Sequence, residues 1–165
     1  MRVIAGQCQP LPRSDVRRIH KPMDTTDEKS QRVRAFMEAL PHCRALGLEM
    51  TEIGGGQAVM RMPYNSALVG DPATGVVAGG AVSALMDSCG GAAVMCHPKA
   101  VASTATLDLR IDYMRAATPG QAITTRAVCH HITRSVAFVR AEAFDDDAST
   151  PVAVANGAFT VEMQS

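Results

Sequence analysis

The sequence of 165 residues predicts a single α+β domain, in which one long apolar helix packs against an antiparallel sheet. Residues 79–96 form an apolar run without proline and with few β-branched residues, which is typical of a buried helix. Residues 104–114 alternate between apolar and polar side chains, which is the period of a strand with one buried face. Further strand-like segments follow after short connections and favour an antiparallel meander: residues 123–131, 135–144 and 152–161.

A helix and two strands are expected before this unit. Residues 25–28 match the T-x-x-E capping box, and apolar residues then recur at helical spacing as far as Leu40. We expect Pro41 to end this helix. Strands are expected at residues 48–53 and 57–62, because these two segments are separated by a run of glycines that indicates a turn.

Residues 1–24 hold prolines and arginines with little periodicity, so we expect a disordered tail before a folded domain at residues 25–165. Neither a secretory signal nor a membrane anchor is expected. The five cysteines include no C-x-x-C pair, which argues against zinc and disulfides and favours reduced thiols in the cytoplasm. With 16 basic residues, 16 acidic residues and 4% aromatics, the chain lacks the features of a nucleic-acid-binding protein.

One carboxylate, Asp87, stands in the apolar run VVAGGAVSALMDSCGG at residues 76–91. On a helix its face is shared by small residues at i+3, i+4 and i+7 spacing: Gly80, Ser83, Ala84, Gly90 and Gly91. Such a face leaves room for a ligand, or for the backbone of a second subunit, to approach the carboxylate. The simpler interpretation is that Asp87 is the solvent-facing residue of a half-buried helix whose glycines permit close packing.

Gly79 and Gly80 begin the same helix, where free N–H groups and the helix dipole can stabilise a developing oxyanion. Asp87 lies about 12 Å further along the helix axis, at a rise of about 1.5 Å per residue. One chain therefore cannot bring both groups to one reacting atom, whereas two antiparallel helices from two subunits can. This spacing predicts a site at a dimer interface.

Three segments together resemble the PaaI-like hotdog-fold acyl-CoA thioesterases, over roughly residues 30–163. They are MPYNSALVGDPATGVVAGGAVSALMDSCGGAAV, TLDLRIDYMRAATPGQ and HITRSVAFVRAEAFD. The resemblance implies the hotdog fold, in which an antiparallel sheet wraps around a long central helix. It also implies hydrolysis of an acyl-CoA without a metal or other cofactor, in a homodimer or in a homotetramer built from two dimers.

The resemblance assigns roles to individual residues. Asp87 corresponds to the catalytic acid and is expected to act as general base or nucleophile. The Gly79 amide is expected to polarise the thioester carbonyl, and Thr106 to position water. The other residues implied at the acyl-CoA substrate are Asp71, Ala78, Gly80, Arg115, Arg134 and Ser135.

Ala78 is the main departure from the family, whose His-Gly-Gly triplet reads Ala78-Gly79-Gly80 here. A methyl group donates no hydrogen bond, so we expect reduced or redirected activity. The alternative is a catalytically impaired hotdog protein that binds acyl-CoA without efficient turnover. Asp71 replaces the usual Asn and would raise one pKa if it lay close to Asp87. A hydratase is a third interpretation, disfavoured because hydratases of this fold pair a carboxylate with a histidine.

Overall fold

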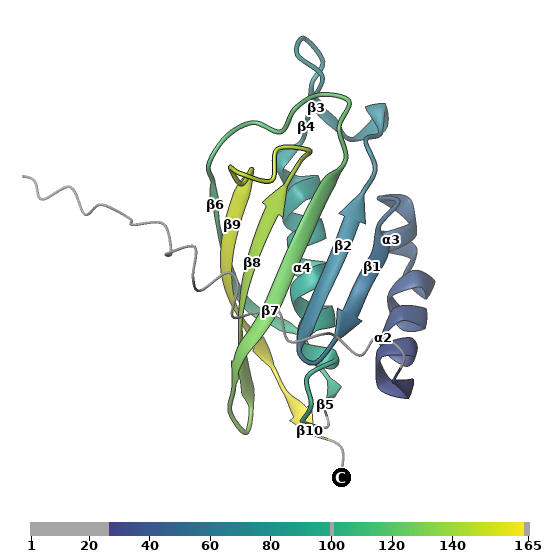
Figure 1. Ribbon diagram of the computed structural model, residues 1–165, viewed down its shortest axis with the longest axis vertical. Coiled ribbons are helices and arrows are strands. Elements are labelled where there is room, and N and C mark those ends of the chain that lie inside the picture. The colour runs from purple at the N-terminus through teal and green to yellow at the C-terminus, as the bar shows by residue number, and fades with distance from the viewer. Residues whose placement is uncertain (1–26, 100, 164–165) are drawn as a thin grey trace, which may run out of the picture.

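The computed structural model describes residues 27–99 and 101–163 and confirms the α+β architecture (Figure 1). The predicted tail at residues 1–24 lies outside the described residues. Within the described part, no helix has both the length and the apolar character needed to cross a membrane. In chain order the elements are α2 (Glu28–Ala39), α3 (Pro41–Ala45), β1 (Glu49–Gly54), β2 (Gln57–Met62), the 3-10 helix η1 (Ser66–Leu68), β3 (Val69–Asp71), β4 (Val76–Val77), α4 (Gly79–Met95), β5 (Val101–Ser103), β6 (Thr106–Tyr113), β7 (Ile123–Ile132), β8 (Val136–Phe144), β9 (Ala153–Thr160) and β10 (Glu162–Met163).

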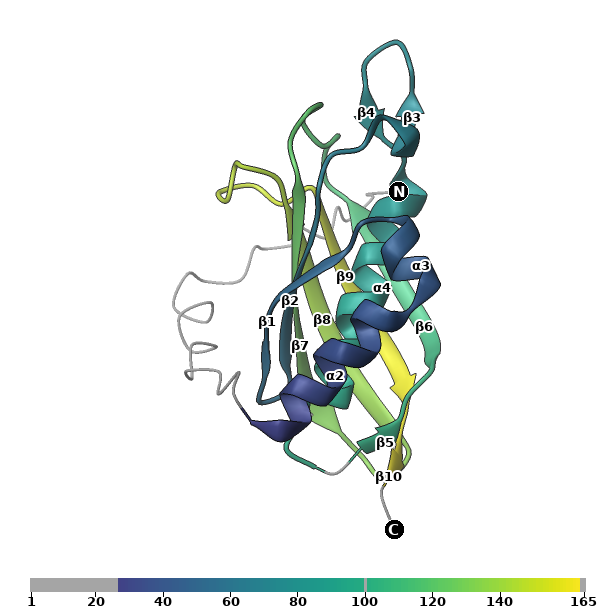
Figure 2. The ribbon, with the colours of Figure 1, turned by 90° about the vertical axis from the view of Figure 1, so that its right-hand side faces the viewer.

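Six strands form one antiparallel sheet in the order β1-β2-β7-β8-β9-β6. The long helix α4 lies against one face of this sheet, and the strands curve around it (Figures 1 and 2). This is the hotdog arrangement that the sequence predicts. α2 packs against β1 and α4, so it lies beside one edge strand, while β6 forms the opposite edge.

The contact between α4 and the sheet is close because glycine and alanine occupy many of the facing positions. Leu85 and Cys89 of α4 are fully buried. The buried positions of β8 and β9 are mostly alanine: Ala137, Ala141, Ala143, Ala153 and Ala155. A Cβ added to Gly90 would lie 2.9 Å from Cζ of Phe159, so the helix cannot carry a side chain there without displacing the ring. Gly90 therefore faces the core, and the prediction that it shares the open face with Asp87 is wrong.

The first helix begins later than the capping box predicts. Asp27 is the N-cap of α2, and its carboxylate accepts hydrogen bonds from the N–H and the hydroxyl of Ser30, both at 2.8 Å. Pro41 does follow the end of α2, but it also opens α3. Proline is favoured at a first helical position because no intrahelical N–H bond is needed there.

A short hairpin determines where α4 begins. Residues 63–74 contain η1 and β3, and β3 pairs with β4. The Ala78 N–H donates to the carbonyl of Leu68 at 2.8 Å. A Cβ added to Gly70 would lie 2.8 Å from Cα of Ala78, so the hairpin backbone packs directly against the residue that precedes Gly79.

Replacing Gly90 with alanine is expected to destabilise the protein by about 1–3 kcal/mol, because the added methyl group overpacks against Phe159. Gly91→Ala is the matched control, since only Thr104 lies within reach, at 4.0 Å. We expect this control to raise the free energy of unfolding by about 0.5–1 kcal/mol through helix propensity. Urea unfolding measures both changes, and equal effects would contradict the placement of Gly90 in the core.

Candidate active site

The structure brings Asp87 and Thr106 together. Asp87 is half-buried on α4, and Thr106 is the exposed first residue of β6. The Thr106 hydroxyl donates to Oδ1 of Asp87 at 2.7 Å. Asp87 takes part in none of the ion pairs between described residues, so no cation of this part of the chain neutralises it. The result is a carboxyl group with one oriented oxygen and a hydroxyl partner.

A β-bulge directs Thr106 toward the helix. Strict alternation along β6 would place Thr106 on the outer face together with Asp108. In the structure the register of β6 against β9 shifts between these two residues, which leaves Leu107 as an extra residue. Thr106 therefore pairs with the buried Phe159 and shares its side of the sheet, which is the side of α4. The predicted alternation fails at Leu107, whose side chain is 58% exposed.

The start of α4 presents free hydrogen-bond donors. Ala78 is the N-cap and makes no side-chain cap bond. Among the described residues, no backbone carbonyl accepts from the amides of Gly79 or Gly80. A Cβ added to Gly80 would meet nothing within 4 Å, so the approach to these amides is open. Unpaired amides at a helix start favour a negatively charged oxygen.

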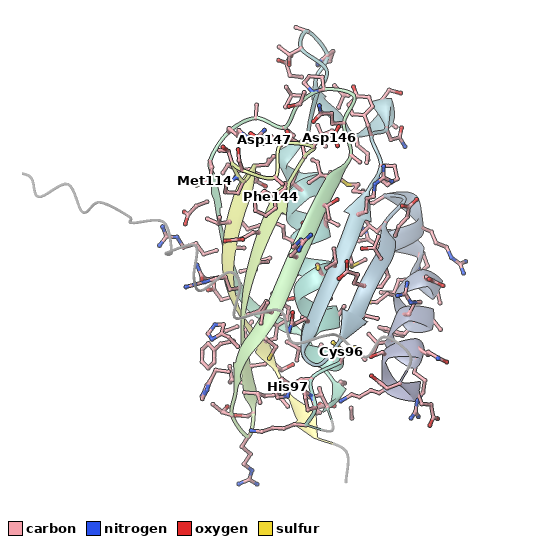
Figure 3. All side chains as sticks on the ribbon, in the orientation of Figure 1. Cys96, His97, Met114, Phe144, Asp146 and Asp147 are labelled. Atoms are coloured by element: carbon pink, nitrogen blue, oxygen red, sulfur yellow. The ribbon has the colours of Figure 1, made fainter. Side chains whose placement is uncertain are left out.

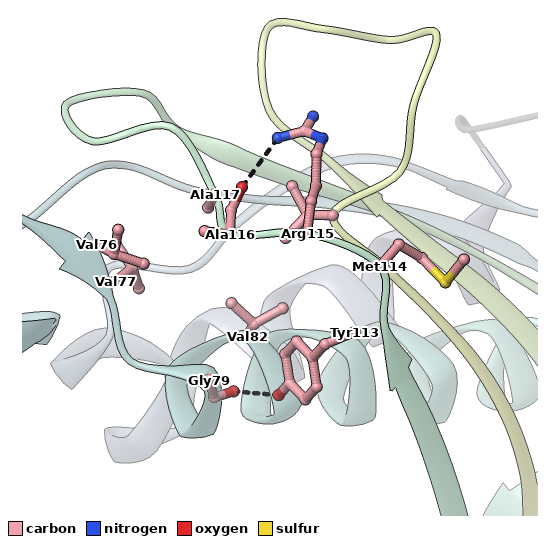
Figure 4. Close-up of a pocket in the computed structure, with 10 residues that line it drawn as sticks. Val76, Val77, Gly79, Val82, Tyr113, Met114, Arg115, Ala116 and Ala117 are labelled. Atoms are coloured by element: carbon pink, nitrogen blue, oxygen red, sulfur yellow. Dashed lines mark hydrogen bonds between the residues drawn. The ribbon is translucent and has the colours of Figure 1, made fainter. Parts of the chain in front are cut away.

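Two hydroxyl groups lie beside Gly79. The Tyr113 hydroxyl donates to the Gly79 carbonyl at 2.5 Å (Figure 4). The Ser83 hydroxyl lies 2.7 Å from the phenolic oxygen and 3.1 Å from the same carbonyl. Neither residue stands out in the sequence, because Tyr113 occupies an apolar position of the alternating strand and Ser83 is one of several small residues on the helix.

β6 runs along α4 in the opposite direction, so each end of the strand contacts one of the candidate groups (Figure 2). Its first residue, Thr106, contacts Asp87, and its last residue, Tyr113, contacts Gly79. α4 is unbroken between Gly79 and Asp87, which separates them by about 12 Å along the axis at about 1.5 Å per residue. A single chain therefore holds the carboxylate and the free amides at two separate places.

A cavity of about 290 Å³ opens beside Gly79 (Figure 4). β4, the first turn of α4, the end of β6 and the segment after it supply most of the lining, which is largely apolar: Val76, Val77, Gly79, Val82, Tyr113, Met114, Arg115, Ala116, Ala117 and Val152. An apolar cavity with a few polar groups at one end is typical of a small-ligand site.

Arg115 is engaged in an ion pair within the chain. Its guanidinium donates two hydrogen bonds of 2.6 Å to the carboxylate of Asp145, whose side chain is fully buried. The N–H and hydroxyl of Thr118 donate to the same carboxylate, at 3.0 and 2.9 Å. The Arg115 guanidinium and these donors hold the pKa of Asp145 well below its usual range. The ion pair thus ties the end of β6 to the segment after β8.

Arg134 and Ser135 lie at the opposite end of the sheet from Arg115. They belong to the turn between β7 and β8, and both are exposed. This end of the molecule carries Cys96 and His97, at the end of α4 (Figure 3). One chain therefore does not bring Arg115 and Arg134 together.

Asp71 stabilises its own hairpin. Its carboxylate accepts from the Thr74 hydroxyl at 2.7 Å and from the Ala73 N–H at 3.0 Å. The Thr74 hydroxyl and the Ala73 amide lower the pKa of Asp71. This direction is opposite to the one expected beside a second carboxylate. No hydrogen bond between described residues joins Asp71 to Asp87.

Comparisons with known proteins agree with the fold. Residues 74–152 match the model of the thioesterase superfamily. A Pseudomonas aeruginosa protein of known structure is 40% identical, with a TM-score of 0.70, over 79% of this chain and 96% of that one. A mutant of the phenylacetic acid degradation protein PaaI from Thermus thermophilus is 29% identical, with a TM-score of 0.63, over 73% and 98% of the two chains. The Escherichia coli PaaI protein, from the phenylacetic acid degradation operon, shares the fold at 20% identity, with a TM-score of 0.72, over 80% and 91%. No curated protein matches the chain.

Replacing Arg115 with methionine is expected to lower the free energy of unfolding by about 2–4 kcal/mol at pH 7, because the buried carboxylate of Asp145 loses its partner. The folded-state pKa of Asp145 is lowered, so the contribution of the ion pair is complete above the usual aspartate pKa of about 4 and is lost as the pH falls below it. Denaturant unfolding at several pH values should show the difference from wild type shrinking in acid.

Arg110→Met is the control for this experiment, because the Arg110–Asp112 pair is exposed. We expect it to change the free energy of unfolding by at most about 1 kcal/mol at pH 7. An Arg115→Met difference that stayed constant between pH 7 and pH 3 would rule out the assigned role of the ion pair.

Proposed function

The chain belongs to the thioesterase superfamily, and we propose that it hydrolyses acyl-CoA thioesters to a free acid and CoA, with Asp87 as the acid–base group. The observation that carries this proposal is the hydrogen bond between Thr106 and Asp87, 2.7 Å long, on the open side of α4. The hydrogen-bonded pair combines a carboxylate that has no cation partner in the described chain with a hydroxyl that can orient water.

The proposed reaction uses the two oxygens of Asp87 differently. Oδ1 accepts from Thr106, which leaves Oδ2 to accept a proton from water. The water oxygen attacks the thioester carbonyl carbon, and the charge that develops on the carbonyl oxygen is stabilised by the Gly79 amide, with Gly80 beside it. The C–S bond then breaks, and the CoA thiolate takes the proton from Asp87. Direct attack by Asp87 on the carbonyl carbon is the nucleophilic variant of the same scheme.

Asp87 and Gly79 of one chain lie too far apart for this reaction, so we propose a site shared by two copies. β6 is an edge strand, and a second copy of β6 can pair with it in antiparallel orientation about a two-fold axis. Such pairing brings the Thr106 end of one strand to the Tyr113 end of the other. Since these ends contact Asp87 and Gly79 respectively, the carboxylate of one copy then meets the amide of the second. A dimer, or a tetramer of two such dimers, is the expected assembly.

The cavity beside Gly79 is proposed to hold the acyl group. A thioester carbonyl at the Gly79 amide would place its acyl group next to the apolar lining contributed by Val82 and Ala117. Arg134 and Ser135 are proposed to contact the CoA nucleotide, because both are exposed and Arg134 forms no ion pair within the described residues. Asp71 and Ala78 would border the carbonyl from the hairpin side. A direct contact between Arg115 and CoA stays a prediction, since its guanidinium is engaged by Asp145.

The second candidate is an acyl-CoA-binding protein with little turnover. It is favoured by Ala78, whose methyl group adds no donor or cap at the helix start. Tight binding of CoA thioesters without release of thiol would support it. A gain of activity in Ala78→His would then show that the missing side chain limits turnover.

Asp87→Asn is expected to lower kcat by about 10²–10⁴-fold, because the amide cannot take the proton from water. The measurement is thiol release from a panel of short, medium, long and aromatic acyl-CoAs. Asp112→Asn is the matched control: it removes a carboxylate from the outer face of β6 and should leave the rate within about twofold. Equal rates for wild type and Asp87→Asn would refute the catalytic assignment.

A shared site predicts that two inactive variants restore each other. Gly79→Pro removes the proposed donor at the first helical position, where the helix backbone accepts proline, and its Cβ would also press on the Tyr113 hydroxyl 3.2 Å away. Asp87→Asn removes the carboxylate. Each variant alone should be inactive. Mixing them with subunit exchange should recover about a quarter of the wild-type activity, because half of the dimers carry one intact site of two. No recovery despite demonstrated exchange would place both groups in one chain.

A further inference from the structure

We infer that Tyr113, assisted by Ser83, is a positioning residue that holds the first turn of α4 and so directs the Gly79 amide. This inference rests on the proposed function, in which that amide stabilises the oxyanion. Its effect on the reaction is carried by the helix backbone, and the experiments below separate this effect from substrate contact by its ring, which lines the cavity proposed for the acyl group.

The start of α4 lacks the usual means of stabilisation. Ala78 provides no side-chain cap, although a capping side chain ordinarily stabilises a helix start. The two residues that follow are glycines, which have the greatest backbone freedom in the unfolded or frayed state. The Leu68 carbonyl holds the Ala78 N–H, which precedes the helix. Without a further anchor within the first turn, the two glycines would fray and the Gly79 amide would lose its fixed direction. A donor for an oxyanion is effective only when its direction is set before the reaction.

The hydroxyl groups of Tyr113 and Ser83 supply that anchor. The Gly79 carbonyl oxygen lies 2.5 Å from the Tyr113 hydroxyl and 3.1 Å from the Ser83 hydroxyl, and the two hydroxyl oxygens lie 2.7 Å apart. The two hydroxyls have only two hydrogens for these three contacts. The shortest contact is the one from the Tyr113 hydroxyl to the Gly79 carbonyl, so we assign the phenolic hydrogen to it. The Ser83 hydrogen is then free to donate to the phenolic oxygen. This order links β6 to the peptide between Gly79 and Gly80, which fixes the Gly80 N–H directly and the Gly79 N–H through the backbone dihedrals of Gly79.

The packing around Gly79 supports the same assignment. A Cβ on Gly79 would lie 3.2 Å from the phenolic oxygen, so the ring of Tyr113 is packed tightly against this residue. The side chain of Tyr113 is nevertheless 49% exposed, at the rim of the cavity (Figure 4). A residue chosen only for packing would not need a hydroxyl at this position. The hydroxyl is directed to the helix carbonyl, and its removal tests the inference without a large change in shape.

The first experiment needs no enzymatic activity. Amide hydrogen exchange is measured by NMR on the full chain for wild type and Tyr113→Phe. We expect exchange of the amides of residues 81–83 to accelerate about tenfold, while the last turn of α4 is unchanged. Tyr64→Phe is the matched control, because it removes a phenolic hydrogen bond to the Gly75 carbonyl, away from the helix. Unchanged exchange in Tyr113→Phe/Ser83→Ala would overturn the inference.

The second experiment connects the turn to the reaction. Tyr113→Phe is expected to lower kcat about tenfold with KM changed less than twofold. Ala78→Ser should restore most of this loss, because a serine N-cap accepts from the second or third amide of the helix and leaves the Gly79 amide free. A loss of kcat that Ala78→Ser does not restore would assign direct substrate contact to Tyr113 and overturn the positioning role. If wild type hydrolyses no thioester, the proposed function fails, while the exchange experiment still decides whether Tyr113 holds the turn.

Discussion

The close packing of α4 on the sheet is the contact on which the rest of the molecule depends. It requires Gly90 on the helix and a row of alanines on β8 and β9, because a Cβ at Gly90 would already press on Phe159. This explains how a chain with 4% aromatic residues forms a dense core. It also means that α4 is held mainly from one side. The opposite side carries small residues around Asp87 and stays accessible.

In the proposed function, β6 places two half-sites on this accessible side, one at Asp87 and one at the Gly79 amide. The strand runs against the direction of α4, so its first residue contacts Asp87 and its last residue contacts Gly79. The bulge at Leu107 is needed for the first of these contacts, because it turns Thr106 from the outer face to the helix side. Since β6 is also an edge strand, the element that organises both half-sites is the one available for pairing with a second copy.

The start of α4 is positioned by its backbone and its neighbours. The Ala78 amide is bound by the Leu68 carbonyl of the hairpin, and the Gly79 carbonyl accepts from Tyr113. In the proposed reaction the hydrogen-bond donor is the backbone N–H of Gly79. Its strength depends on the direction of that N–H and not on a side chain at position 78. This is the physical reason to expect catalysis in spite of the alanine that replaces the family histidine.

The sequence by itself determined the order of the main elements α2, β1, β2, α4 and β6 to β9, the length of α4 and the separation of Asp87 from the free amides, because these follow from local periodicity and helix geometry. The short elements were seen only in the structure: α3, η1, β3, β4, β5 and β10. The family resemblance also pointed to Thr106, whose hydroxyl donates to Asp87, and its role in the reaction stays a prediction. The direction of the Thr106 side chain was decided only by the tertiary structure, since the bulge at Leu107 exists in the pairing of β6 with β9. The same holds for Arg115, whose partner Asp145 lies thirty residues away. Periodicity encodes which residues are buried, whereas register and long-range pairs depend on the energies of contacts between distant segments, which no local pattern contains.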